Sequence, residues 1–149
     1  MSPRYHKGRR SARARKLQRQ FGNNPDMVYT DVALRGTNKY ALAIVGKPPG
    51  QGLLTCATAR AASANNAEAL AIALAIKAKD VLGRLSLVLT DSMVACKLFL
   101  TGRLPHNTIR LLGPDLTQDH PIIWCPGHAG LYGNERADGA ARALTNRAA

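Results

Sequence analysis

The acidic residues are few enough to be considered one by one as candidates for chemistry. Four of the nine lie in turns or at the ends of expected elements, where aspartate is ordinary: Asp26, Asp80, Asp115 and Asp119. The other five are Asp31, Glu68, Asp91, Glu135 and Asp138. Carboxylates that gather without cysteine or paired histidine suit a hard divalent cation such as Mg²⁺. A group of three or four such carboxylates can hold two ions, which is the arrangement used for phosphodiester hydrolysis.

Each of these acids also has a purely structural interpretation. Glu68 and Glu135 could simply favour the amino-terminal ends of helices through the helix dipole. Asp91 could be a turn residue between a strand and a helix. Asp31 is harder to explain in this way, because aspartate is depleted in strands and a buried carboxylate needs a cationic partner. The types and positions alone therefore leave a metal site and a set of unrelated structural acids as open alternatives.

A histidine lies in a glycine-rich loop shortly before the last of these acids. The stretch is WCPGHAGLYGNERADGAARAL, in which His128 precedes Asp138 by ten residues. Cys125 and His128 have a spacing that could begin a zinc site, but no second close pair completes a tetrahedral set. We therefore interpret Cys125 as a packing residue at the end of a strand. The pattern raises the question of which chemistry needs a mobile histidine beside a fixed aspartate.

The elements that would position these side chains follow from changes in hydrophobic period. We expect strands over residues 27–34, 39–45, 53–59, 85–90 and 121–125. We expect helices over residues 67–79, 93–100 and 135–144, with N-caps at Asn65 or Asn66, Ser92 and Asn134, and a loop over 111–120. The first three strands are joined by short turns and predict an antiparallel meander. The order βββαβαβα then predicts a mixed sheet with helices on both faces.

Basic residues are concentrated at the amino-terminal end of the chain. The 149 residues, one domain's length, contain 21 Lys and Arg against nine Asp and Glu, and residues 1–25 carry eight basic residues and no acid. We expect a disordered basic arm over 1–25, followed by a folded domain over 26–146. Such an arm favours nucleic acid as a partner, although a solvated arm without a specific partner is the alternative. Its candidate contacts are Arg9, Arg10, Arg13, Arg15 and Lys16.

The remaining composition bears on the cellular compartment. Three cysteines without a close pair predict free thiols in a reducing environment. The longest apolar run, residues 69–76, is too short to span a bilayer, and the basic segment lacks the apolar region of a signal peptide. We expect an intracellular protein without a membrane partner, in either nucleus or cytoplasm.

The ordered acidic motifs resemble a type 1 ribonuclease H domain over residues 27–144. The motifs are TDVAL, NNAEALAIALA, LTDS, GHAG and NERADGAA, which supply Asp31, Glu68, Asp91, His128 and Asp138 respectively. The closing WCPGHAGLYGNERADGAAR most resembles reverse transcriptase-associated domains of retrotransposons without long terminal repeats. The resemblance implies an α/β ribonuclease H-like fold with a five-stranded mixed sheet. It also implies a monomer that derives from a longer retroelement polyprotein.

The activity that the resemblance implies is endonucleolytic cleavage of the RNA strand in RNA–DNA hybrids. Two Mg²⁺ ions about 4 Å apart, replaceable by Mn²⁺, would be held by the carboxylates. Asp31 would bridge both ions, Glu68 and Asp91 would hold one, and Asp138 the other. His128, carried by a flexible loop and with a pKa near neutrality, would transfer a proton or assist product release.

The residues after Asp31 leave an alternative to this activity, and two asparagines near Glu68 have two possible roles. Val32 and Ala33 follow Asp31, where the family usually has a small residue and then serine. The alternative function is therefore a decayed ribonuclease H fold that binds nucleic acid without cutting it. Asn65 and Asn66 are candidates to contact the hybrid across its minor groove, where the 2′-hydroxyl distinguishes RNA, and helix capping is their alternative role.

Overall fold

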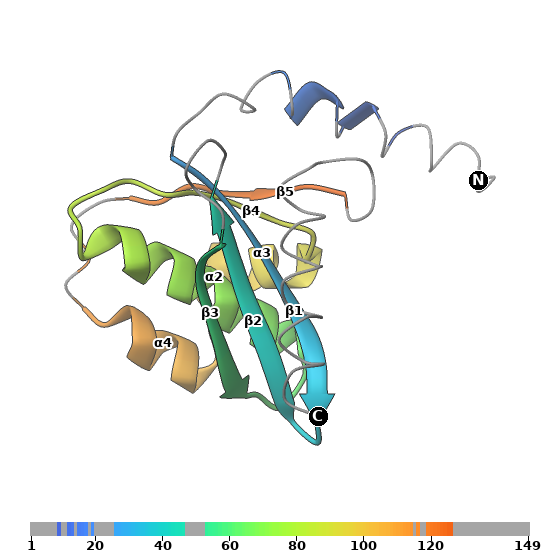
Figure 1. Cartoon of the computed structure of the whole chain (residues 1–149), viewed down its shortest axis with the longest axis vertical. Coiled ribbons are helices and arrows are strands. Elements are labelled where there is room, and N and C mark those ends of the chain that lie inside the picture. Colours follow the sequence, from blue (N-terminus) through green and yellow to red (C-terminus); the bar gives the residue numbers. More distant parts are fainter. Residues whose placement is uncertain are drawn as a thin grey trace.

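The computed structural model of the chain describes residues 9, 12–13, 15–17, 19, 26–46, 53–114, 116 and 119–126 (Figure 1). Its strands are β1 (Met27–Gly36), β2 (Lys39–Gly46), β3 (Leu53–Arg60), β4 (Leu87–Thr90) and β5 (Ile122–Trp124). Its helices are α2 (Ala64–Asp80), α3 (Met93–Thr101) and α4 (His106–Leu112). The predicted helix over 135–144 and its cap Asn134 lie outside the described residues.

The five strands form one mixed sheet in the order β3-β2-β1-β4-β5. β2 pairs antiparallel with β1 and β3, whereas β4 pairs parallel with β1 and β5, so the predicted meander and mixed sheet are confirmed. The pairing of β1 with β4 ends at Thr30 opposite Thr90. β1 then continues alone on that side, so Asp31 is its first residue beyond the end of β4.

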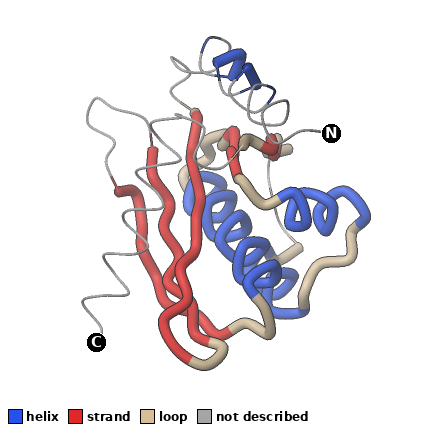
Figure 2. Tube along the Cα trace, turned by 90° about the vertical axis from the view of Figure 1, so that its right-hand side faces the viewer, coloured by secondary structure: helices blue, strands red, loops and turns tan. Residues whose placement is uncertain are grey.

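The core lies on both faces of this sheet. Val28 and Val88 pack against α2 in a cluster that includes Ile72 and Ile76. Side chains at the alternate strand positions, such as Tyr29, form a second cluster on the other face. In Figure 2 the helices α2, α3 and α4 lie on one side of the strands, consistent with the first cluster.

Helix α2 is buried on most of its circumference, as its alanine-rich sequence predicts. The alanines at alternate positions from Ala67 to Ala75 are at most 1% exposed. Because their side chains are small, they bring the helix backbone close to the sheet. The N-cap is Ser63 rather than Asn65 or Asn66, because the Ser63 Oγ accepts the Asn66 N–H at 3.2 Å. Among the described residues, no helix has both the length and the apolar character that crossing a membrane requires.

Helix α4 is not expected from the sequence, and its last two residues fall in the predicted loop over 111–120. Its N-cap is Pro105, which makes no side-chain capping bond, so the usual serine, threonine or aspartate signal is missing. Tertiary contacts compensate: Leu112 packs against the α2 cluster, and the Lys77 ammonium donates to the Leu112 carbonyl at 3.3 Å.

The basic amino-terminal segment contacts the sheet. Its described residues are helical, and Leu17 is only 2% exposed in a core cluster with Met27, Tyr29 and Leu89. Arg13 Nη2 donates to the Trp124 carbonyl at 3.3 Å. Leu17 thus contributes to the core of the folded domain, and Arg13 contacts its sheet. The expected disorder of residues 1–25 as a whole stays a prediction. The boundary at residue 26 stays a prediction.

Candidate metal centre

Three predicted carboxylates meet where β4 ends. Asp31 comes from β1, Glu68 from the second turn of α2, and Asp91 directly follows β4. One ligand oxygen from each lies within 4.8 Å of the others. The parallel register of β1 and β4 brings Asp31 beside Asp91. Close packing of α2 on the sheet, through the buried Ala67 and Ala69, brings Glu68 to both.

The trio concentrates negative charge away from water. Asp31 is 6% and Glu68 9% exposed, and Asp91 is half-buried. Burial raises the pKa of Glu68 to about 9, with the neighbouring charges of Asp31 and Asp91 acting in the same direction. Glu68 Oε2 is buried without a hydrogen-bond partner in the described part of the chain. An oxygen-binding cation would offset the repulsion and give this oxygen a partner, so the residues fit a hard divalent metal ion.

The backbone around Asp31 restrains its carboxylate. Asp31 Oδ1 accepts the Val32 N–H at 2.9 Å. The Val32 side chain packs on the α2 side of the sheet against a cluster that contains Tyr40 and Leu42. The larger side chain after Asp31 is therefore accommodated in the core.

Asp91 is held between β4 and α3 by contacts that the sequence did not reveal. The Trp124 indole N–H donates to the Asp91 carbonyl at 3.2 Å. The Ser92 N–H donates to Thr90 Oγ1 at 3.1 Å, and Ser92 Oγ accepts the Ala95 N–H at 3.1 Å, which confirms Ser92 as the cap of α3. A tryptophan at the end of a predicted strand was the signal available, because a half-buried indole N–H usually finds an acceptor.

Two further predicted site residues cannot be placed beside this trio. His128 and Asp138 lie outside the described residues, so their roles stay predictions. Arg10 is also outside them, whereas Arg9, Arg15 and Lys16 are described and exposed.

A pocket of about 450 Å³ lies near the amino-terminal end of α2, beside one of the two predicted hybrid contacts. Asn66 lines this pocket, together with the polar residues Arg60, Asn107 and Asn38. Asn107 Nδ2 donates to the Arg60 carbonyl at 3.2 Å, which joins α4 to the end of β3. Asn65 is exposed in the first turn of α2.

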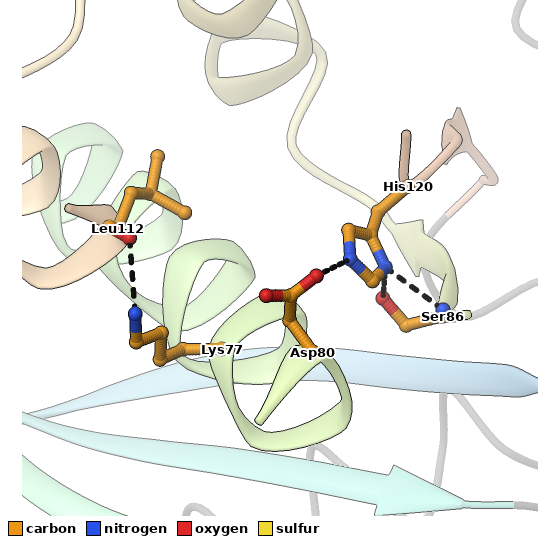
Figure 3. Close-up of polar contacts among 5 residues, drawn as sticks. All are labelled: Lys77, Asp80, Ser86, Leu112 and His120. Atoms are coloured by element: carbon orange, nitrogen blue, oxygen red, sulfur yellow. Dashed lines mark hydrogen bonds and ion pairs between the residues drawn. The ribbon is translucent and has the colours of Figure 1, made fainter. Parts of the chain in front are cut away.

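A second polar cluster, for which the sequence carries no local signal, joins the end of α2 to the starts of β4 and β5 (Figure 3). His120 Nδ1 accepts the Ser86 N–H at 2.9 Å. Nε2 therefore carries the ring proton and donates to Asp80 Oδ1 at 2.9 Å. The side chains of His120 and Asp80 are 1% and 4% exposed, and Ser86 is fully buried. With its serine closed to solvent, this Ser–His–Asp set is a structural cross-link.

The cysteines are free in the described structure, as predicted. Cys125 is fully buried in the same core cluster as Leu17 and Tyr29, which confirms its packing role. Burial raises the pKa of its thiol to about 12. The protonated thiol is a poor metal ligand, because metal binding requires the thiolate.

A five-stranded mixed sheet with two buried carboxylates and one half-buried carboxylate at the end of its parallel strands defines a ribonuclease H-like α/β domain with a candidate metal centre. The family model for RNase H matches residues 23–146, and the chain belongs to this family. A search of curated proteins finds no match. Membership in the family supports a nuclease function on RNA–DNA hybrids and the use of divalent metal ions in general terms.

Proposed function

We propose that the chain is an endonuclease that hydrolyses the RNA strand of RNA–DNA hybrids at a carboxylate site for two Mg²⁺ ions. The observation that carries the proposal is the convergence of Asp31, Glu68 and Asp91 within 4.8 Å in a chain of the RNase H family. Mn²⁺ is the proposed substitute. The retroelement origin and the monomeric state are predictions that rest on the resemblance of the sequence motifs.

The carboxylates have distinct tasks in this proposal. Asp31, Glu68 and Asp91 would hold metal, and Asp138 is proposed to complete the set. When bound, the ions would activate a water molecule and stabilise the leaving oxygen. The protein's own contribution is positioning: the Val32 N–H restrains Asp31, and Trp124 fixes the backbone of Asp91. Glu68 would give up its proton when a cation enters, because the charge of the cation offsets the burial and the neighbouring negative charges that raise the pKa of Glu68.

The pocket beside α2 supports a sugar-phosphate backbone as the substrate. It offers one guanidinium group and several amides on the same side of the sheet as the helix that carries Glu68. Cations and amides are the usual partners of phosphate and ribose oxygens, and the 2′-hydroxyl offers both a donor and an acceptor. We propose that Asn65 and Asn66 contact the hybrid here, and that His128 moves a proton or assists product release.

The alternative of a decayed, binding-only domain rests in part on Val32 and Ala33, which follow Asp31. The position of the Val32 side chain against the α2-side core favours the enzyme, because this packing does not displace the carboxylate of Asp31. The presence of all three described carboxylates in one cluster favours it as well.

Cleavage of an end-labelled RNA–DNA hybrid in Mg²⁺ tests the proposal. The wild type should cut the RNA strand of the hybrid and leave duplex DNA intact. Asp31→Asn should abolish cutting, because the amide is a poor ligand for a hard dication. Asp119→Asn, at an exposed acid outside the cluster, is the matched control and should retain activity. Binding of the hybrid without cutting by the wild type would favour the decayed module.

A further inference from the structure

The described part of the basic amino-terminal segment is a helix with two distinct stripes. Leu17 and Arg13 are four residues apart and therefore lie on one side of a helix. Leu17 is buried in the core and Arg13 is half-buried against β5. This side of the helix faces the domain.

The other stripe carries cations. Lys16 directly follows Arg15, and Arg19 comes three residues after Lys16 and four after Arg15. These spacings place the three side chains on one side of a helix, and all three are exposed. Ala12, one turn before Lys16, is exposed as well and is too small to cover these charges. Residues 1–25 contain no acid that would neutralise them within the segment. The described residues thus form a cationic ridge, defined as Arg15, Lys16 and Arg19, whose orientation is set by the buried stripe.

Two hydrogen bonds connect this helix to the carboxylate centre. Arg13 Nη2 donates to the Trp124 carbonyl at 3.3 Å, and the Trp124 indole N–H donates to the Asp91 carbonyl at 3.2 Å. Cys125, which follows Trp124, packs with Leu17 and donates its N–H to the Thr90 carbonyl at 2.8 Å. The helix is therefore seated on the strand end next to Asp91. In Figure 1 its described pieces lie beyond β5, at the top of the view.

We infer that the cationic ridge is a fixed binding surface for the phosphate backbone of a nucleic-acid duplex, held in a set position relative to the carboxylate centre. Phosphate contacts set the register and orientation of a protein on a duplex. A docked helix makes these contacts without the ordering cost that a disordered arm would incur on binding. The described exposed stripe offers no large apolar side chain for insertion into a lipid surface, which favours nucleic acid over a membrane.

The inference rests on the proposed function only for the identity of the duplex as an RNA–DNA hybrid. Its test therefore uses binding rather than cleavage. A fluorescent hybrid of about one to two helical turns is titrated with full-length protein in EDTA, where metal-dependent cutting does not occur, over a series of salt concentrations.

Loss of the ridge charges should weaken binding and reduce its salt dependence. The triple variant Arg15→Gln, Lys16→Gln and Arg19→Gln should lower affinity at least tenfold at low salt. The slope of log affinity against log salt should fall by up to about 0.9 for each lost phosphate contact. Arg15→Gln alone should weaken binding more than Arg84→Gln, a matched loss at an exposed arginine between α2 and β4. A triple variant whose affinity and slope equal those of the wild type would overturn the inference.

Undocking should weaken binding even when every ridge charge is retained. Leu17→Ser should reduce hybrid affinity at least threefold, measured well below its melting temperature, while Leu17→Met should bind like the wild type. Arg13→Gln, compared with Arg84→Gln, is a second undocking variant that leaves the core side chain in place. If neither Leu17→Ser nor Arg13→Gln bound more weakly than its control, the ridge would not depend on docking, and the inference would fail.

The two proposals fail separately. A wild type that never cuts the hybrid, but binds it through the ridge, would refute the proposed nuclease and leave this inference standing. A triple variant that binds and cuts like the wild type would refute this inference and leave the nuclease standing.

Discussion

At the residue scale, Glu68 is the side chain whose chemistry depends most on whether a cation is bound. It lies at 9% exposure between two other carboxylates, and one of its oxygens has no hydrogen-bond partner in the described residues. Its pKa of about 9 means that it holds a proton near neutral pH until a cation replaces that proton. Burial of Glu68, together with the charges of the neighbouring aspartates, thus makes the metal affinity of the centre dependent on pH.

The metal-free protein should lose stability as pH rises from about 4.5 to about 9. The folded state keeps the Glu68 proton over this range while the unfolded state releases it, so stability is highest below the ordinary pKa and declines through the raised one. Melting curves in EDTA at several pH values would measure the decline. Glu68→Gln should flatten it, because the amide does not titrate. An unchanged decline in Glu68→Gln would assign the pH dependence to other groups.

Trp124→Phe should weaken the metal centre without unfolding the domain. Phenylalanine keeps most of the packing but removes the N–H that the Asp91 carbonyl accepts, a hydrogen bond worth about 1 kcal/mol. We expect Mg²⁺ affinity to fall several-fold in calorimetry, with a small decrease in melting temperature. If Mg²⁺ affinity were unchanged while melting dropped, Trp124 would serve the fold alone.

At the scale of elements, the sequence predicted those parts of the fold whose signals are local. Strand-forming residues separated by short turns identified β1, β2 and β3, and the serine before Met93 identified the cap of α3. Helix α4 escaped because it is stabilised by packing and by Lys77 from another helix rather than by its own cap. Of the candidate site, the carboxylates were predictable from residue type and motif. The Trp124 contact was not, because it depends on the pairing of β4 with β5.

The Asp80–His120–Ser86 cross-link shows the same limit and leads to a prediction. His120 connects the end of α2 with the start of β4 through both ring nitrogens. His120→Ala would leave the buried Asp80 carboxylate and Ser86 N–H without this partner, and we expect a loss of about 2–4 kcal/mol of stability. Denaturant unfolding would measure it, with the neighbouring exposed acid variant Asp119→Asn as control. A loss as small as that of the control would contradict a structural role.

At the scale of the whole molecule, the basic segment and the sheet form one packed unit in the described structure. The sequence predicted a separate arm because charge dominates residues 1–25 and large apolar side chains are few among them. A single leucine places the described part of the segment against the domain: Leu17 packs on the sheet face opposite α2, next to Tyr29 and Cys125. The charge of the segment predicts nucleic acid as its partner, whereas the burial of Leu17 determines where the segment lies.

Deletion of residues 1–25 should therefore reduce both stability and duplex binding. Removal of Leu17 exposes apolar surface of Tyr29 and Leu89, and losing a buried leucine side chain typically costs about 2–5 kcal/mol. Loss of the basic residues should in addition flatten the salt dependence of hybrid binding, since fewer counterions are released. Leu17→Ala in the full-length chain helps to separate the effects: it should reproduce most of the stability loss in denaturant unfolding and weaken hybrid binding by undocking, but it should lose less of the salt slope than the truncated protein because every cation is retained. A truncated protein that unfolds at the same denaturant concentration as the full chain would show that the burial of Leu17 contributes nothing to stability. A truncated protein with an unchanged salt slope would remove the segment from the nucleic-acid interface.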